Sequence, residues 1–165
     1  MIAILGLLTI VYLFFISVQD MRERAIYTFP ANVLTVVWSG VAIRKMTMPA
    51  IAVVGVITGY LMLYVLFNKL RIWGEGDSDL FLLSSSVFLA VISAKLSVGN
   101  IIWQIILFAL VLVIALIAGF VEAKVKKTKL DKSSSIALAP GFLFVICAML
   151  MKGVILCYEP VKRSY

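Results

Sequence analysis

The stretch VGNIIWQIILFALVLVIALIAGFV, residues 98–121, contains no charged side chain. The hydrocarbon core of a bilayer is about 30 Å thick, so an α-helix needs about 20 residues to cross it. Residues 98–121 are therefore predicted to form a membrane-spanning helix. The rest of the chain has a similar character, because 64% of its 165 residues are hydrophobic and its mean hydropathy is +1.14.

Five further apolar segments accompany this one. Together the six predict an all-α, polytopic membrane protein with a single membrane-embedded domain over residues 1–165. The fourth segment is the weakest, because its uncharged run covers only residues 80–94. In the third, Gly55 and Gly59 have the spacing of small residues that lets helices approach closely. The predicted segments are residues 2–19, 31–48, 50–67, 78–95, 98–121 and 135–156.

Basic residues are concentrated in alternate loops. The loops after the first, third and fifth segments carry nine Lys and Arg residues, and the two loops between them carry three. The positive-inside rule therefore predicts a multi-pass protein of the cytoplasmic (inner) membrane, with those three loops in the cytoplasm and both termini outside. Anionic lipid headgroups account for the net charge of +7, so membrane lipid is an expected partner and nucleic acid is not.

Histidine is absent from the chain, and the two cysteines are Cys147 and Cys157. A chain without histidine cannot form a His-based catalytic triad or the usual zinc site. Two cysteines in one apolar segment are too few for a disulfide framework or a zinc site, which favours a packing role. No metal and no other cofactor is expected.

Five of the eight acidic residues lie in the first and third loops: Asp20, Glu23, Glu75, Asp77 and Asp79. Two predicted spans separate these loops, so they lie on the same face of the membrane. Two carboxylates in a partly dry pocket do not both ionise easily, and one becomes an acid and the other a base. Such a pair suits water-mediated peptide hydrolysis. Helix dipoles favour Asp77 as the carboxylate and Asp20 as the acid.

Three stretches resemble the GxGD-type membrane aspartyl proteases, and most closely the type IV leader peptidases, or prepilin peptidases. DMRERAIYTFPANVL, residues 20–34, is similar to the family's first motif. Gly74, Gly76 and the aspartate that follows match its Gly-x-Gly-Asp, whereas Asp79 stands where the family usually has lysine. KSSSIALAPGFLF, residues 132–144, resembles the proline-containing stretch that opens the family's last span.

This resemblance implies an endopeptidase that removes the basic leader from prepilin-like (class III signal) precursors at the cytoplasmic membrane face. The catalytic residues would be Asp20 and Asp77, with Gly74 and Gly76 shaping the approach of an extended substrate. The partner would be a precursor with an apolar N-terminal helix. The paired Cys-x-x-Cys motifs of bifunctional members are missing, so no methyltransferase activity is expected. Asp79 would add negative charge beside the pair and raise the pKa of Asp77 or shift activity.

Other interpretations stay open from the sequence. A small polytopic transporter or channel subunit would use the same carboxylates to bind a cation or to relay protons. A catalytically idle protein of the same fold would account for Asp79. Asp20, Asp77 and Asp79 can also act simply as interfacial helix caps. The sequence leaves the identity of the precursor and the oligomeric state open.

Overall fold

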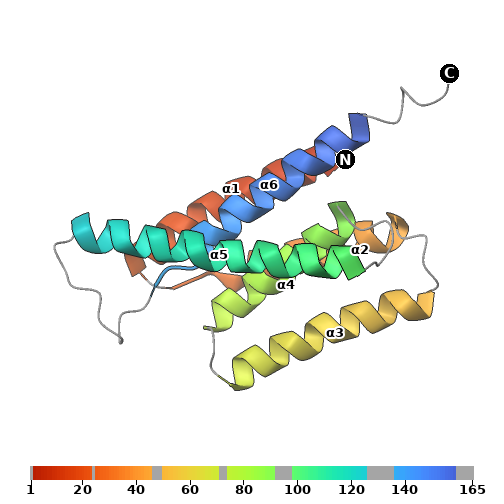
Figure 1. The fold of residues 1–165 in the computed structure, drawn as a ribbon, viewed down its shortest axis with the longest axis horizontal. Helices are drawn as coiled ribbons and strands as arrows, with labels where there is room; N and C mark the ends of the chain where they lie inside the picture. Colours follow the sequence, from red (N-terminus) through yellow and green to blue (C-terminus); the bar gives the residue numbers. More distant parts are fainter. Residues whose placement is uncertain are drawn as a thin grey trace.

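The computed structural model describes residues 2–23, 25–45, 50–70, 74–91, 98–125 and 136–158. Within this part of the chain the regular secondary structure is entirely α-helical, which confirms the predicted all-α class (Figure 1). Several residues used in the sequence predictions lie outside the described set, namely the side chains of Glu75 and Cys157 and the basic residues Arg24, Arg71, Lys95, Lys126, Lys127, Lys129 and Lys132.

Six helices follow one another along the described part of the chain, close to the six apolar segments. The largest differences are of four residues: the first and fifth helices end four residues later than predicted, the fourth ends four residues earlier, and the sixth begins four residues later. The helices are α1 (Ile2–Glu23), α2 (Thr28–Lys45), α3 (Ala50–Lys69), α4 (Glu75–Val91), α5 (Val98–Val125) and α6 (Ala139–Tyr158).

Proline sets where α6 begins. Pro140 is the second residue of that helix, where the backbone N–H would have no partner within the helix, so its absence costs no hydrogen bond. The first turn closes when the N–H groups of Gly141 and Phe142 donate to the carbonyl of Leu138, at 3.0 and 3.3 Å. The N–H of Ala139 is left free to bond outside its own helix.

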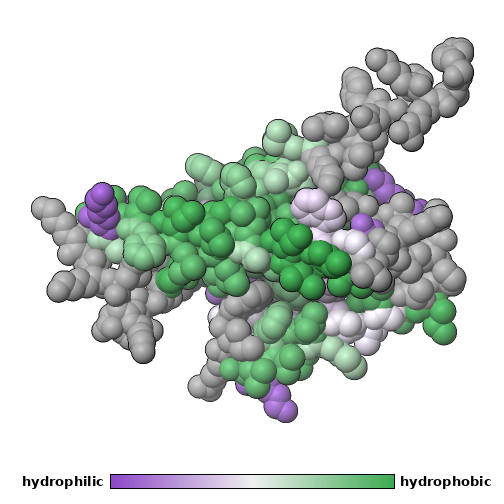
Figure 2. Space-filling model, in the orientation of Figure 1, coloured by the Kyte–Doolittle hydropathy of each residue, from purple (hydrophilic) through white to green (hydrophobic). Residues whose placement is uncertain are grey.

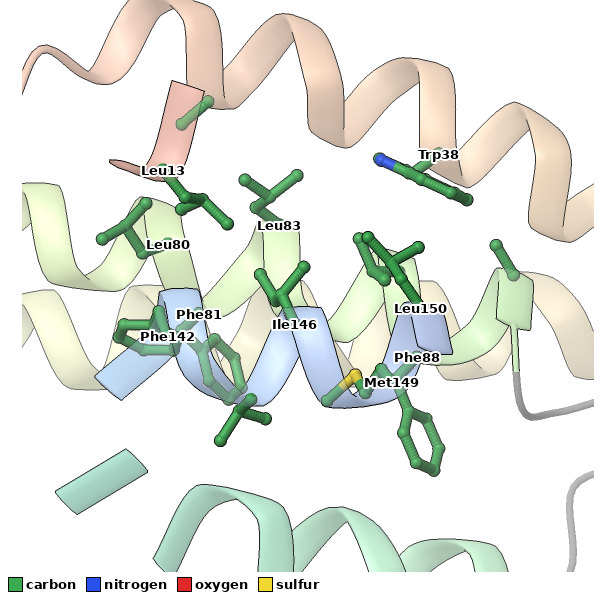
Figure 3. Packing of buried hydrophobic residues seen from close by; sticks show 14 of the residues in the cluster. Leu13, Trp38, Leu80, Phe81, Leu83, Phe88, Phe142, Ile146, Met149 and Leu150 are labelled. Atoms are coloured by element: carbon green, nitrogen blue, oxygen red, sulfur yellow. The ribbon is translucent and has the colours of Figure 1, made fainter. Parts of the chain in front are cut away.

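Helix α4 lies at the centre of the described fold (Figure 1). It packs against α2, α6 and α3, while α6 also packs against α1 and α5. From Ser78 to Ala90 every side chain of α4 is buried except Leu82, which is partly buried. Its apolar residues form the middle of a core to which α1, α2 and α6 contribute, as Figure 3 shows for Leu13, Trp38, Leu83 and Ile146.

Polar side chains join the helices inside this apolar core. Trp38 of α2 donates its indole N–H to the hydroxyl of Thr9 on α1 at 2.9 Å, and Ser39 and Ser86 bond across α2 and α4 at 3.2 Å. These contacts satisfy polar groups that would otherwise be costly to bury. A third set of hydrogen bonds joins three helices: Tyr60 of α3 donates to Gln104 of α5, and Gln104 donates to Ser85 of α4.

Helix α5 is mostly exposed, whereas α4 is mostly buried. Most of its side chains are exposed, and Figure 2 shows them as a broad apolar surface on the face in view. Its buried residues form a narrow stripe that includes Val111, Ala115 and Gly119. Two stretches, Ile2–Glu23 and Gly99–Val125, are long and apolar enough to cross a membrane, whereas Val54–Lys69 and Ala139–Met151 are apolar but shorter.

The close approach of two helices occurs at a different glycine from those predicted. A Cβ added at Gly55 or Gly59 would meet nothing within 4 Å, so the expected helix contact through these two residues is wrong for the described fold. At Gly141, by contrast, an added Cβ would lie 2.4 Å from the carbonyl oxygen of Val111. Gly141 therefore allows the backbones of α5 and α6 to touch.

Candidate functional site

Asp20 caps a helix that is remote from it in sequence. It lies in the last turn of α1 and is buried, with 6% of its surface exposed. The main-chain N–H of Ala139 donates to its Oδ2 at 3.1 Å. Ala139 is the first residue of α6, and a helix N-terminus favours a negative charge. This contact therefore stabilises the ionised form of Asp20 and ties α1 to α6.

Asp77 is held in the first turn of α4. Gly74 precedes this helix, and its carbonyl accepts from the N–H of Ser78 at 3.1 Å and from the Ser78 hydroxyl at 3.2 Å. Asp77 reaches back, because its carboxylate accepts a hydrogen bond from the Gly74 backbone. Its Oδ2 lies 3.4 Å from where a Cβ at Gly74 would be. This is one half of a capping box, in which the side chain of the third helical residue bonds to the backbone of the residue before the helix; Gly74 has no side chain to supply the other half.

Asp20 on α1 acts electrostatically on Asp77 on α4. Asp77 lies in the first turn of α4, ahead of the apolar segment predicted over residues 78–95. Its pKa is raised from 3.8 to about 6, first because the carboxyl is buried and second because the negative charge of Asp20 acts on it, while the Gly74 hydrogen bond opposes the rise. A like charge nearby has this effect only at short range. Asp20 and Asp77 therefore behave as an interacting pair.

The surroundings of the pair favour roles opposite to those inferred from helix dipoles. The dipole of α4 does favour a charge on Asp77, but it contributes only about 0.3–1 kcal/mol, and the raised pKa shows that burial and Asp20 outweigh it. Asp20 in turn receives the Ala139 N–H, a donor that no sequence pattern around Asp20 reveals. The raised pKa of Asp77 and the N–H donor to Asp20 therefore favour Asp77 as the protonated member of the pair.

Gly74 and Gly76 have different surroundings. Gly74 is exposed, and Asp77 is the neighbour that an added side chain there would meet. At Gly76 an added Cβ would lie 2.7 Å from the Cβ of Ile26, with two more Ile26 carbons at 3.3 Å. Gly76 is thus required by the packing of Ile26. The expected opening for substrate at Gly76 is filled by this contact, and the exposed side of the motif is at Gly74.

Asp79 is buried, with 5% of its surface exposed, and lies one residue beyond Ser78 on α4. Its charge acts on the hydroxyl of Tyr12, whereas the causes named for the raised pKa of Asp77 are burial and Asp20. The expectation that Asp79 raises the pKa of Asp77 is therefore not supported. The charge of Asp79 therefore acts on a residue of α1.

Two contributors to the site were missed in the sequence: the Ala139 N–H and Tyr12. Pro140 was a usable signal for the first, because proline early in a helix marks a free N-terminus. Ile26 lies in the stretch that resembles the family's first motif, but its contact with Gly76 gives no local signal, and neither do the contacts of Tyr12, because each joins distant segments. Among the side chains that the structure describes, no group of three His, Cys, Asp or Glu residues is arranged to hold a metal ion.

Comparison with known protein families, with curated proteins and with solved structures finds no match for this chain.

Proposed function

We propose that this protein is a membrane aspartyl endopeptidase of the prepilin peptidase type. The observation that supports the proposal is that the charge of Asp20, on α1, contributes to the raised pKa of Asp77, on α4. A buried carboxyl pair that shares a proton is the machinery of aspartic proteases. The six helices would cross the inner membrane, with this pair at the cytoplasmic face and both termini outside.

In the proposed reaction Asp20, as the carboxylate, takes a proton from a water molecule. The resulting hydroxide attacks the carbonyl carbon of the scissile peptide bond, and protonated Asp77 donates to the carbonyl oxygen or to the leaving amine. The C–N bond then breaks, releasing a carboxylic acid and an amine. Asp77 must hold its proton, so activity falls as pH rises through its pKa of about 6. A bound peptide that excludes water would raise this pKa further.

The substrate in this proposal is a prepilin-like precursor, with a Lys/Arg-rich leader followed by an apolar helix. Negative charge at Asp20 is complementary to a basic leader in the cytoplasm. The apolar helix of the precursor would remain in the bilayer, so the cut falls at the membrane surface. The exposed backbone at Gly74 lies beside Asp77 and gives an extended peptide room to approach.

The test is cleavage of a co-expressed precursor of this kind by the Asp20→Asn and Asp77→Asn variants. Asparagine keeps an oxygen that accepts the Ala139 or Gly74 N–H, so each variant is expected to insert and fold. Cleavage should be lost in both. Glu23→Gln is the matched control, because Glu23 is an exposed carboxylate on the same helix as Asp20, and it should retain cleavage. Cleavage by both asparagine variants would refute the peptidase assignment.

Cation or proton transport is the second candidate, and the polar residues inside the helical core favour it. Gln104, Ser85 and Ser86 are buried in the described structure, and intramembrane polar groups often mark ion pathways. Ion flux into vesicles that contain the purified protein distinguishes the two functions. Flux that Asp77→Asn abolishes, with no cleavage of the precursor by the wild type, would replace the peptidase assignment.

A further inference from the structure

Tyr12 reaches from α1 to the short link between α1 and α2. Its hydroxyl donates to the carbonyl oxygen of Tyr27 at 2.8 Å. Residues 25–27 form this link and are not helical. The charge of Asp79 on α4 also acts on the Tyr12 hydroxyl. One phenol group therefore bonds to the link, has a backbone hydrogen bond at Ala31 of α2, and is acted on by the charge of a buried carboxylate of α4.

The same link is pressed against α4 at the residue that precedes Asp77. Ile26 is the neighbour of Tyr27, and its Cβ lies 2.7 Å from the place of a Cβ at Gly76. Ile26 therefore packs directly on the Gly76 backbone, at a place where no side chain would fit. The link is thus in contact with α4 at Gly76 and is bonded to α1 through Tyr12.

Tyr12 and Asp20 belong to the same helix, so α1 acts on both members of the carboxyl pair. It presents Asp20 directly, where the Ala139 N–H fixes the carboxylate. It acts on Asp77 indirectly, through the Tyr27 carbonyl, the Ile26 side chain and the Gly76 backbone. A rigid helix that holds both partners sets the spacing between them.

We propose that Tyr12 is a positioning residue for the Asp20–Asp77 pair, whose hydroxyl holds residues 25–27 against Gly76 and so fixes how closely Asp77 approaches Asp20. The role in cleavage rests on the proposed function, whereas the role in pairing does not. Loss of the hydroxyl lets the link relax, water enters beside Asp77, and the two carboxyls separate.

The test compares Tyr12→Phe with Tyr60→Phe in the full-length protein in nanodiscs. Tyr60→Phe is the control, because it also removes one tyrosine hydroxyl that bonds to another helix, to Gln104, but from a tyrosine on α3 and not on α1. The probe is a synthetic peptide with a Lys/Arg-rich leader, a glycine and an apolar helix. The kcat, KM and pH profile of cleavage are measured for both variants.

Tyr12→Phe is expected to lower kcat roughly tenfold, about the effect of one lost hydrogen bond, with KM little changed. The alkaline limb of its pH profile should move to lower pH by about half a unit or more, because separation from Asp20 and entry of water both lower the pKa of Asp77. Tyr60→Phe should leave this limb in place. An alkaline limb in Tyr12→Phe that coincides with that of Tyr60→Phe would overturn the proposal.

A second measurement separates this proposal from the proposed function. Asp77 is titrated by ¹³C NMR of labelled aspartate carboxyls, with its resonance assigned by its loss in Asp77→Asn. A lower midpoint in Tyr12→Phe supports the positioning role even if the wild type cleaves no precursor, in which case only the peptidase assignment fails. An unchanged midpoint overturns the positioning role, whatever the cleavage result.

Discussion

Helices α4 and α5 have opposite compositions and opposite surroundings. α5 has no charged residue over residues 98–121 and exposes most of its side chains. α4 begins with three acidic residues within five positions, contains a run of three serines, and is buried almost completely from Ser78 to Ala90. In a protein that folds in water the more apolar helix would be expected inside. The reversed order here is the one expected of a protein in lipid.

The physical reason is that lipid accepts apolar side chains and cannot bond to polar ones. A helix at the periphery must therefore be apolar on its outer faces, as α5 is. A helix surrounded by other helices can carry polar groups if they are bonded, and Ser86 and Ser85 of α4 bond to Ser39 and Gln104. Asp77, one member of the candidate pair, therefore lies on a helix with polar residues, whereas Asp20 lies on α1, which is long and apolar enough to cross a membrane.

Truncation of one leucine in each helix is expected to give the largest difference between α4 and α5. Leu83 of α4 is fully buried, whereas Leu112 of α5 is 41% exposed. Leu83→Ala is expected to lower the free energy of unfolding by about 2–5 kcal/mol, because it leaves a cavity in the core. Leu112→Ala should cost well under half as much. Unfolding in mixed micelles measures both, and equal losses would contradict the central position of α4.

Removal of the Asp77 charge should stabilise the fold at neutral pH. Its pKa is higher in the folded protein, about 6, than its ordinary value of 3.8, so the folded state binds the proton more tightly. Stability therefore falls as pH rises from about 4 to about 6 and is constant above. Asp77→Asn avoids this loss, a gain on the order of 3 kcal/mol at pH 7.5.

The measurement for Asp77→Asn is thermal unfolding at pH 7.5 and at pH 3.5, with Glu23→Gln as the exposed control. The gain should be present at pH 7.5 and absent at pH 3.5, and the control should show no difference. If the difference in stability between Asp77→Asn and the wild type is the same at pH 7.5 and pH 3.5, burial of the Asp77 charge carries no cost. The buried carboxyl of Asp77 would then not destabilise α4.

The contact between α5 and α6 should be disrupted by a side chain at Gly141. Gly141→Ala places a Cβ 2.4 Å from the Val111 carbonyl oxygen, so α5 and α6 must move apart, at a cost of about 1–3 kcal/mol. Gly55→Ala has nothing within 4 Å and should be neutral or slightly stabilising, because alanine favours the helix. Unfolding measurements that rank the two variants in the reverse order would contradict the α5–α6 contact.

The smallest expected effect is at the opposite end of α4. The Lys45 ammonium donates to the carbonyl oxygen of Ala90 at 3.3 Å, close to the negative end of the helix dipole. Lys45→Met should lower stability by about 0.3–1 kcal/mol. Arg44→Met is a suitable control, since Arg44 is also exposed at the end of α2. Equal effects of the two changes would remove the special role of Lys45 as a cap for α4.

Much of the fold follows from composition alone. Backbone groups in an apolar medium must bond within their own segment, so long uncharged stretches such as residues 98–121 become helices wherever they occur. The alternation of basic loops, and the two helices between Asp20 and Asp77, also place both aspartates at the same end. The sequence therefore determined the helices and a candidate pair, and its prediction of six membrane spans stays a prediction.

Tertiary structure decided the contacts that define the site and the core. Gly141 rather than Gly55 allows two helices to touch, Ile26 fills the space at Gly76, and the Ala139 N–H fixes the charge on Asp20. Each depends on a segment that is distant in the chain, and local composition carries no information about which distant group arrives. For the same reason the dipoles of single helices favoured a different proton assignment from the packed structure, since burial and a neighbouring charge exist only after the helices have packed.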